Sequence, residues 1–156
     1  MRILIVAVGN RMPQWVEAGF DEYARRMPRD VRIELLEIKP EKRGPGITAE
    51  RILVREAQRI EVALPAACTR IVLDERGKVF RSSELARQLS AWRALGKDIA
   101  FLIGGADGLS PKLKASASAL LALSALTLPH GLVRVLLAEQ LYRAHTINSG
   151  HPYHRE

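Results

Sequence analysis

The stretch LSALTLPHGLVRVLLAEQLYRA, residues Leu123–Ala144, decides the fold predicted for this chain. Small and β-compatible residues open it, Pro129-His130-Gly131 interrupts it, and a segment that is apolar on most of its helical circumference follows. This order predicts a fifth strand at Leu123–Leu128, a tight turn, and a buried helix from about Gly131 towards Ile147. Because proline lacks the backbone N–H and glycine lacks Cβ, the turn leaves backbone groups open to a ligand.

The predicted last helix carries apolar residues in several directions, among them Leu132, Val135 and Leu136. One face of a sheet cannot cover them all, and a helix that is apolar all round requires a second surface. A homodimer supplies that surface, and a core built wholly within one chain is the alternative. We expect the homodimer.

A second turn, IGGADG at Ile103–Gly108, follows another apolar run. It lacks the spacing of a dinucleotide-binding or Walker motif. One interpretation is a backbone that lets a ligand approach closely at the carboxyl end of a strand, where open α/β sheets place their sites. The other is an ordinary turn that requires positive φ. If the two turns leave adjacent strands, they form one ligand pocket.

Apolar runs and helix-start signals alternate along the rest of the chain. The remaining strands are expected at 2–8, 31–38, 70–74 and 98–103. The remaining helices are expected from Pro13 to about Met27, from Thr48 to before Pro65, from a cap at Ser82 or Ser83 to before Gly96, at Pro111, and over Ala115–Ala122. This order predicts an α/β fold with a mainly parallel sheet sandwiched by helices. No linker interrupts it, so residues 1–156 are expected to form one domain.

The chain carries 24 basic and 17 acidic residues, a net charge of +7, and its pI is near 10.1. Such a surplus is typical of proteins with a polyanionic partner, most often nucleic acid, and it also occurs in basic proteins without one. No apolar run is long enough to span a bilayer and no secretory signal is apparent, so we expect a cytoplasmic protein. The single Cys68 excludes an internal disulfide or a cysteine metal cluster within one chain.

All four histidines lie at or after position 130. His151 and His154 have the spacing of a metal pair, but no third ligand is evident, so no metal is expected. The terminal HPYHRE combines histidine with Tyr153 and Arg155, which can stack on bases and contact phosphate. Histidine near a substrate can also transfer protons. A disordered tail is the alternative.

Several motifs together resemble one known family. They are ILIVAVGN, MPQWVEAGFDEYARRMP, KRG at Lys42–Gly44, LDERGK, FLIGGADGLS, LSALTLPHGLVRVLLAEQLYRA and the terminal HPYHRE. In combination they are similar to the RlmH family, the ribosomal RNA large subunit methyltransferases H of the SPOUT superfamily. The resemblance implies a C-terminal trefoil knot, a homodimer and S-adenosylmethionine as cofactor. It also implies methylation at N3 of a pseudouridine in the helix 69 loop of 23S ribosomal RNA, on the assembled 70S ribosome.

The resemblance also assigns expected roles to individual residues. Positions that match the family's cofactor-binding positions are Leu73, Gly104 with Gly105 beside it, and Leu123, Ser124, Ala125, Leu126, Thr127 and Leu128. For proton transfer from N3 we expect His130 or His154, and Arg155 is expected to hold RNA phosphate or to stabilise the deprotonated base. Weaker candidates for RNA contacts are Lys42, Arg43, Arg134 and Arg143, since a solvated face explains each equally well. Asp107 is assigned no catalytic role.

Three other classes of protein share some of these features. A ribosome-binding module without catalysis shares the charge and the dimer, but it needs no cofactor pocket. A dinucleotide-dependent oxidoreductase shares the sheet, but Gly9-Asn10-Arg11-Met12 offers only one glycine after the first strand. A membrane-surface protein needs a basic amphipathic helix, and the predicted last helix is apolar on too many sides.

Overall fold

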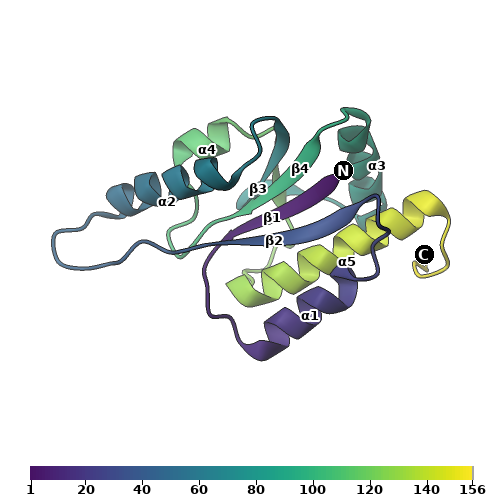
Figure 1. Cartoon of the computed structure of the whole chain (residues 1–156), viewed down its shortest axis with the longest axis horizontal. Helices are drawn as coiled ribbons and strands as arrows, with labels where there is room; N and C mark the ends of the chain where they lie inside the picture. Colours follow the sequence, from purple (N-terminus) through teal and green to yellow (C-terminus); the bar gives the residue numbers. More distant parts are fainter. Residues whose placement is uncertain (156) are drawn as a thin grey trace.

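The computed structural model describes residues 1–155, and its centre is a five-stranded sheet (Figure 1). The strands are β1 (Arg2–Val8), β2 (Arg32–Ile38), β3 (Cys68–Val79), β4 (Asp98–Ile103) and β5 (Ala119–Ala122). Their order in the sheet is β2-β1-β4-β3-β5, and every paired neighbour runs parallel. The predicted α/β class with a parallel sheet is confirmed.

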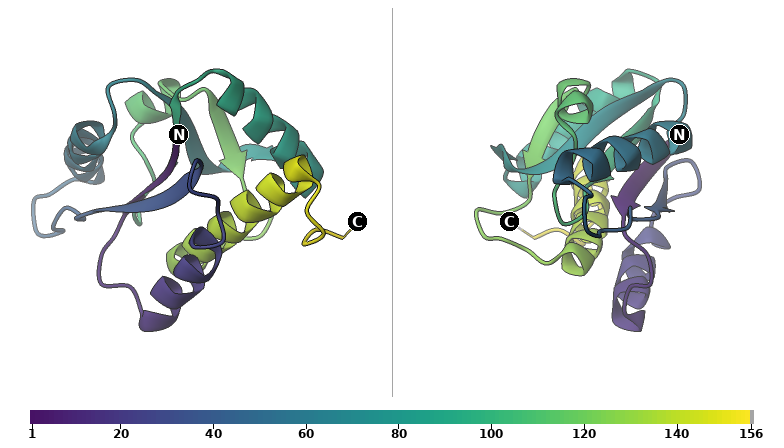
Figure 2. Two further views of the ribbon diagram at one scale, coloured as in Figure 1. Left: turned by 45° about the vertical axis from the view of Figure 1, so that its right-hand side comes forward. Right: turned by 90° about the vertical axis from the view of Figure 1, so that its left-hand side faces the viewer.

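Helices cover both faces of the sheet. One face carries α1 (Gln14–Ala24), α3 (Ser82–Ala94) and α5 (His130–Ser149), and the other carries α2 (Ala49–Ala63) and α4 (Pro111–Ala115) (Figures 1 and 2). Strand β1 needs cover on both faces, because its residues after Arg2 are all apolar and buried. Ile3 and Ile5 pack with α1, α3 and α5, whereas Leu4 and Val6 pack with α2 and α4. Successive residues of a strand face opposite sides, so β1 joins the two halves of the core.

Two helices begin at side-chain caps. Thr48 accepts a hydrogen bond from the Arg51 N–H (3.2 Å) and Ser110 accepts one from the Leu113 N–H (3.2 Å), so both cap the helices that follow them. The predicted serine cap of α3 is wrong. The cap position is Arg81, and the Ser82 hydroxyl instead donates to Gln140 of α5 (2.7 Å). A contact between helices therefore takes the hydroxyl that local capping would have used.

The fifth strand lies earlier than predicted. The structure has β5 at Ala119–Ala122, where a helix was expected, and Leu123–Leu128 forms a loop instead of a strand. The cause is tertiary pairing with β3, because Gly77 lets the two backbones approach closely. A Cβ on Gly77 would lie 2.7 Å from backbone atoms of Leu120 and Leu121. This pairing outweighs the helix propensity of the alanine-rich segment.

Strand β3 is longer than predicted. It was expected to end at Asp74, but it continues to Val79 with an irregularity in its pairing. Leu73 and Lys78 both pair with Leu121, so residues 74–77 bulge out of the ladder. The polar, glycine-containing sequence of this segment indicates a break in the strand, and the break is a bulge rather than an end.

Residues 1–155 contain no helix that is both long and apolar enough to cross a membrane.

Candidate functional site

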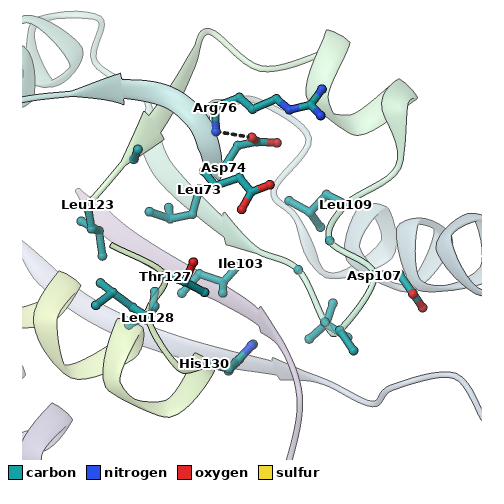
Figure 3. Close-up of a pocket in the computed structure, with 18 of the residues that line it drawn as sticks. Leu73, Asp74, Arg76, Ile103, Asp107, Leu109, Leu123, Thr127, Leu128 and His130 are labelled. Atoms are coloured by element: carbon teal, nitrogen blue, oxygen red, sulfur yellow. Dashed lines mark hydrogen bonds between the residues drawn. The ribbon is translucent and has the colours of Figure 1, made fainter. Parts of the chain in front are cut away.

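A cavity of about 950 Å³ opens at the carboxyl edge of the sheet (Figure 3). Its lining includes the last residues of three strands, Val8 of β1, Ile103 of β4 and Ala122 of β5. Leu73, the last residue of β3 before its bulge, lies with them. Parallel α/β sheets bind ligands at this edge. The volume lies in the range of roughly 300–1,000 Å³ that is typical of small-molecule sites.

The glycine-rich turn after β4 forms one wall. Gly105 and Gly108 pair across it, and the Gly108 N–H donates to the Gly105 carbonyl (3.0 Å). Gly108 has φ +78°, which an L side chain rarely adopts, and a Cβ on Gly104 would lie 2.4 Å from the Gly108 carbonyl carbon. The turn therefore requires glycine and also exposes its backbone to the cavity, so the two interpretations of IGGADG do not exclude each other.

The loop Leu123–Leu128 forms the opposite wall. Leu123, Ser124, Leu126, Thr127 and Leu128 line the cavity, whereas Ala125 is exposed and is not among its lining residues. The Leu126 N–H donates to the Ser124 hydroxyl (2.9 Å), which holds the loop in its turn. With Leu73, Gly104 and Gly105, eight of the nine residues predicted to hold a cofactor border one cavity. The glycine turn and this irregular loop present backbone N–H and C=O groups, which suit a nucleoside ligand.

His130 borders the same cavity at the first position of α5. Its Nε2 is buried and has no hydrogen-bond partner among residues 1–155. Burial lowers the pKa of His130 below its ordinary value of 6.5, and the nearby Arg134 charge adds to this effect, while a hydrogen bond to the Gly104 backbone opposes it. The imidazole is therefore neutral at neutral pH and has an unpaired nitrogen that can accept a proton.

Arg134 lies one helical turn after His130 and is buried, with 1% of its surface exposed. Its guanidinium donates to the Glu37 carboxylate (2.8 Å) and to the Gly9 carbonyl (3.0 Å). A Cβ on Gly9 would lie 3.1 Å from the Arg134 Nη2 and 3.5 Å from the His130 Nε2. Burial contradicts both interpretations offered for Arg134, an RNA contact and a solvated face, because its side chain fastens α5 to the exits of β1 and β2.

The far end of α5 carries a different group of side chains, which we call the tail cluster: Tyr142, Tyr153, Arg143, Arg26 and Glu139. The Tyr153 hydroxyl donates to Glu139 (3.0 Å), and its ring lies 4.7 Å from the Tyr142 ring. The guanidinium groups of Arg143 and Arg26 lie 5.0 and 6.0 Å from the Tyr153 ring centroid. Burial and the Glu139 hydrogen bond raise the pKa of Tyr153 to about 12.

His154 and Arg155 follow the tail cluster and do not reach the cavity that His130 borders. The tail lies beside the C-terminal end of α5 (Figures 1 and 2). A helix of 20 residues is roughly 30 Å long, so the two predicted proton acceptors lie at opposite ends of α5. His154 is half-buried with an unpaired Nδ1, and Arg155 is exposed. Within one chain the structure brings together the cofactor positions and His130, but not the tail.

Several charged residues line the cavity, although the sequence alone assigned none of them to it. Asp74 pairs with Lys114 (2.6 Å) and accepts the Arg76 N–H (2.8 Å); these bonds lower its pKa (Figure 3). Arg43 pairs with Asp107, which joins the loop before α2 to the glycine turn. Glu56 also lines the cavity, and the sequence held a signal for it: an acid between Ile52 and Ile60 on the buried stripe of α2.

No group of three or more histidine, cysteine, aspartate or glutamate side chains that could hold a metal ion occurs within residues 1–155.

Comparisons with known proteins agree over nearly the whole chain. A family model described as "Predicted SPOUT methyltransferase" matches residues 1–154. Proteins named ribosomal RNA large subunit methyltransferase H from Ralstonia pickettii, Paraburkholderia phymatum and Nitrosospira multiformis are 61%, 59% and 57% identical to it over 155 residues. Each of these alignments covers 99% of both sequences.

Two solved structures share the fold at low sequence identity. One is a probable methylase family protein from Haemophilus influenzae Rd KW20, with TM-score 0.54 and 12% identity, over 99% of this chain and 70% of that one. The other is a probable rRNA-methyltransferase from Porphyromonas gingivalis, with TM-score 0.56 and 18% identity, over 94% of this chain and 69% of that one.

The full-length relatives assign the chain to a narrower family than the shared fold does. Their identity to this chain exceeds one half and extends from end to end. The chain therefore belongs to the SPOUT methyltransferases and, within them, to the family of ribosomal RNA large subunit methyltransferase H.

Proposed function

We propose that this protein transfers a methyl group from S-adenosylmethionine to N3 of a pseudouridine in the helix 69 loop of 23S ribosomal RNA, in the cytoplasm and on the assembled 70S ribosome. Family membership implies a methyl donor of this type. The observation that carries the proposal is the cavity at the carboxyl edge of the sheet, because it unites the glycine turn, the Leu123–Leu128 loop and His130.

Binding the donor is the first task of the chain's residues. The backbone of the Leu123–Leu128 loop offers N–H and C=O groups to an adenine edge, Gly104-Gly105 leave room for the donor beside them, and the Leu73 side chain offers apolar contact. For Ala125 we propose that only the backbone contacts the donor, since its side chain is exposed. When bound, S-adenosylmethionine supplies an activated methyl group and departs as a neutral thioether.

Removing the N3 proton is the second task. His130 is suited to it, because its buried Nε2 is unpaired and its lowered pKa keeps the imidazole unprotonated at neutral pH. His154 is the alternative acceptor. Arg155 holds an RNA phosphate or stabilises the deprotonated base through charge-assisted hydrogen bonds. The chain's positive charge favours the ribosomal RNA electrostatically.

A homodimer is part of the proposal. Since His130 and His154 lie at opposite ends of α5, the tail of a second copy is needed if both act on one nucleotide. Apolar side chains available for such an interface include Trp15, which is 56% exposed, and Leu126, which is 76% exposed. The trefoil knot implied by the resemblance, and the treatment of residues 1–156 as one domain, stay predictions.

Methyl transfer to ribosomes tests the proposal directly. Purified protein is incubated with methyl-labelled S-adenosylmethionine and either 70S ribosomes or free large subunits from cells that lack the enzyme. We expect label in 23S ribosomal RNA, confined to the helix 69 loop and stronger with 70S ribosomes. Label elsewhere in the RNA, or equal label after the pseudouridine is replaced by uridine, would contradict the proposed target.

A further inference from the structure

Glu56 is a buried carboxylate in the wall of the cavity. It lies on α2 between Ile52 and Ile60, and 5% of its surface is exposed. Placing a carboxylate in such a position is costly unless hydrogen bonds or an opposite charge compensate it. Nothing in the helix itself requires an acid there, because its neighbours on the stripe are apolar.

The surroundings of Glu56 compensate only part of this cost. Its Oε2 accepts the Glu41 backbone N–H (3.0 Å). Its Oε1 lies on the side of the glycine turn, where a Cβ on Gly105 would be 3.5 Å away. Glu56 takes part in no ion pair among residues 1–155, so no cationic side chain of these residues contacts the carboxylate that borders the cavity.

The other acids of the cavity are in a different situation. Asp74 pairs with Lys114, and Asp107 pairs with Arg43. Glu41 pairs with Arg59 (2.5 Å) and with Arg55 (3.3 Å). Glu75 is exposed to solvent, which screens its charge. Glu56 alone among these carboxylates is both buried and without a cationic side chain in the part of the chain that is described.

The position of Glu56 relative to His130 indicates which part of a ligand it meets. Gly105 neighbours Val8, which packs on the α2 side of β1, whereas Gly9 neighbours His130 on the α5 side. The carboxylate and the proton acceptor thus border the cavity from opposite faces of the sheet. The reacting methyl group belongs at the His130 side. Of the two parts of the donor that extend from its sulfonium, only the amino-acid part carries a cation, so that part belongs at the Glu56 side.

We propose that Glu56 is the counter-ion of the α-ammonium group of the methyl donor and selects for the amino-acid part of that molecule. The proposal rests on the proposed function. A buried carboxylate with an open oxygen and no cation matches a ligand ammonium, which would form a charge-assisted hydrogen bond in a site shielded from water. Glu56 takes no part in the methyl transfer itself.

Calorimetric titration of Glu56→Gln with three nucleosides tests this role. The amide keeps the shape of the side chain and an acceptor for the Glu41 N–H. S-Adenosylmethionine and S-adenosylhomocysteine both carry the ammonium, whereas 5′-methylthioadenosine lacks it. We expect the first two to bind about tenfold to hundredfold more weakly, as expected for loss of a hydrogen bond to a charged group, and 5′-methylthioadenosine to bind as to the wild type.

Glu61→Gln is the matched control, because Glu61 lies on the same helix and pairs with Arg70 (2.7 Å) outside the cavity. It should bind all three nucleosides with wild-type affinity. Equal weakening of 5′-methylthioadenosine by Glu56→Gln, or unchanged affinity for S-adenosylhomocysteine, would overturn the role of Glu56. If the wild type binds none of the nucleosides, the proposed function fails instead.

A measurement on the wild type keeps the proposal open to refutation even if Glu56→Gln does not fold. S-Adenosylhomocysteine without its amino group should bind the wild type at least about tenfold more weakly than the parent compound. Equal affinity for the two compounds would exclude a buried counter-ion for the ammonium. A thermal melt of unliganded Glu56→Gln adds a second readout, since removing an unpaired buried charge should not lower its midpoint.

Discussion

The two ends of helix α5 differ in how they are held. At the first turns, buried Arg134 reaches Glu37 and Gly9 and sets His130 against the cavity. At the last turns, the tail cluster packs aromatic rings and guanidinium groups on a half-exposed surface. The first end is fixed by hydrogen bonds from a fully buried guanidinium, and the second by contacts of partly exposed side chains that solvent weakens. The difference indicates a rigid cavity wall at one end and an adaptable surface at the other.

The largest expected effect is on methyl transfer, and it tests whether the two ends of α5 act together within one chain or between the two chains of a dimer. His130→Ala should abolish most methyl transfer, and His154→Ala should do the same if the tail completes the site. If the tail of one copy serves the cavity of the other, an equal mixture of the two variants should regain about a quarter of wild-type activity, because half of the dimers are mixed and each has one intact site. Activity is measured after the variants are unfolded together and refolded. No recovery in the mixture would show that the two histidines do not meet across copies.

A large effect on stability is expected at the first end alone. Arg134→Met should lower the free energy of unfolding by about 3 kcal/mol, because it removes two hydrogen bonds from a buried guanidinium and leaves Glu37 unpaired. Arg143→Met, in the tail cluster, should cost less than about 1 kcal/mol, because its pair with Glu139 is partly exposed. Urea denaturation measures the loss in free energy of unfolding for each variant. Equal losses would show that the two ends of α5 are held equally strongly.

Two glycines give a smaller test of the same contrast. Gly104→Ala should cost about 2 kcal/mol, because the new Cβ meets the Gly108 backbone and the turn must open. Gly150→Ala, after the last turn of α5, should cost about 1 kcal/mol, since its φ of +71° is unfavourable but nothing lies within 4 Å. Donor affinity should fall only for Gly104→Ala. Thermal melts and titration measure both effects, and a fall in affinity for Gly150→Ala would show that the ends are coupled.

The smallest effect is expected for Tyr153→Phe, which removes the hydrogen bond to Glu139 and should cost about 0.5–1 kcal/mol. The pKa of Tyr153 is raised in the folded state from 10.0 to about 12, so between these values the folded protein binds more protons than the unfolded one. The protonated Tyr153 hydroxyl therefore contributes its full share of stability below pH 10, and this share is lost as the pH rises towards 12. The free energy of unfolding should fall more between pH 9 and pH 11 for the wild type than for Tyr153→Phe, as urea denaturation at the two pH values would measure.

The elements that sequence alone predicts well are those whose burial is complete. Continuous apolar runs identify β1 and β4, and their burial on both faces confirms the interpretation. The segment before α5 was misassigned because its strand depends on pairing with β3 beside Gly77, a contact between distant residues. Periodicity cannot report such a contact, and alanine-rich sequence favours the wrong element.

The backbone turns of the candidate site could be predicted from the sequence, whereas its buried charged side chains could not. Glycine and proline identify the two turns, and the cavity does lie between them. Arg134 and Glu56 look like ordinary surface charges in a helical sequence, yet both are buried. The position of Glu56 between two buried isoleucines was the available signal, whereas the burial of Arg134 depends on Glu37, nearly a hundred residues earlier.

The ion pair between Arg43 and Asp107 has a kinetic consequence. It joins a solvent-exposed loop to the glycine turn at the rim of the cavity, and Arg43 is more than half exposed. Dissolved salt screens such a pair. We therefore expect ionic strength to act twice, once on the attraction of this basic chain to ribosomal RNA and once on the contact between this loop and the glycine turn, so turnover and RNA affinity need not follow salt concentration in parallel.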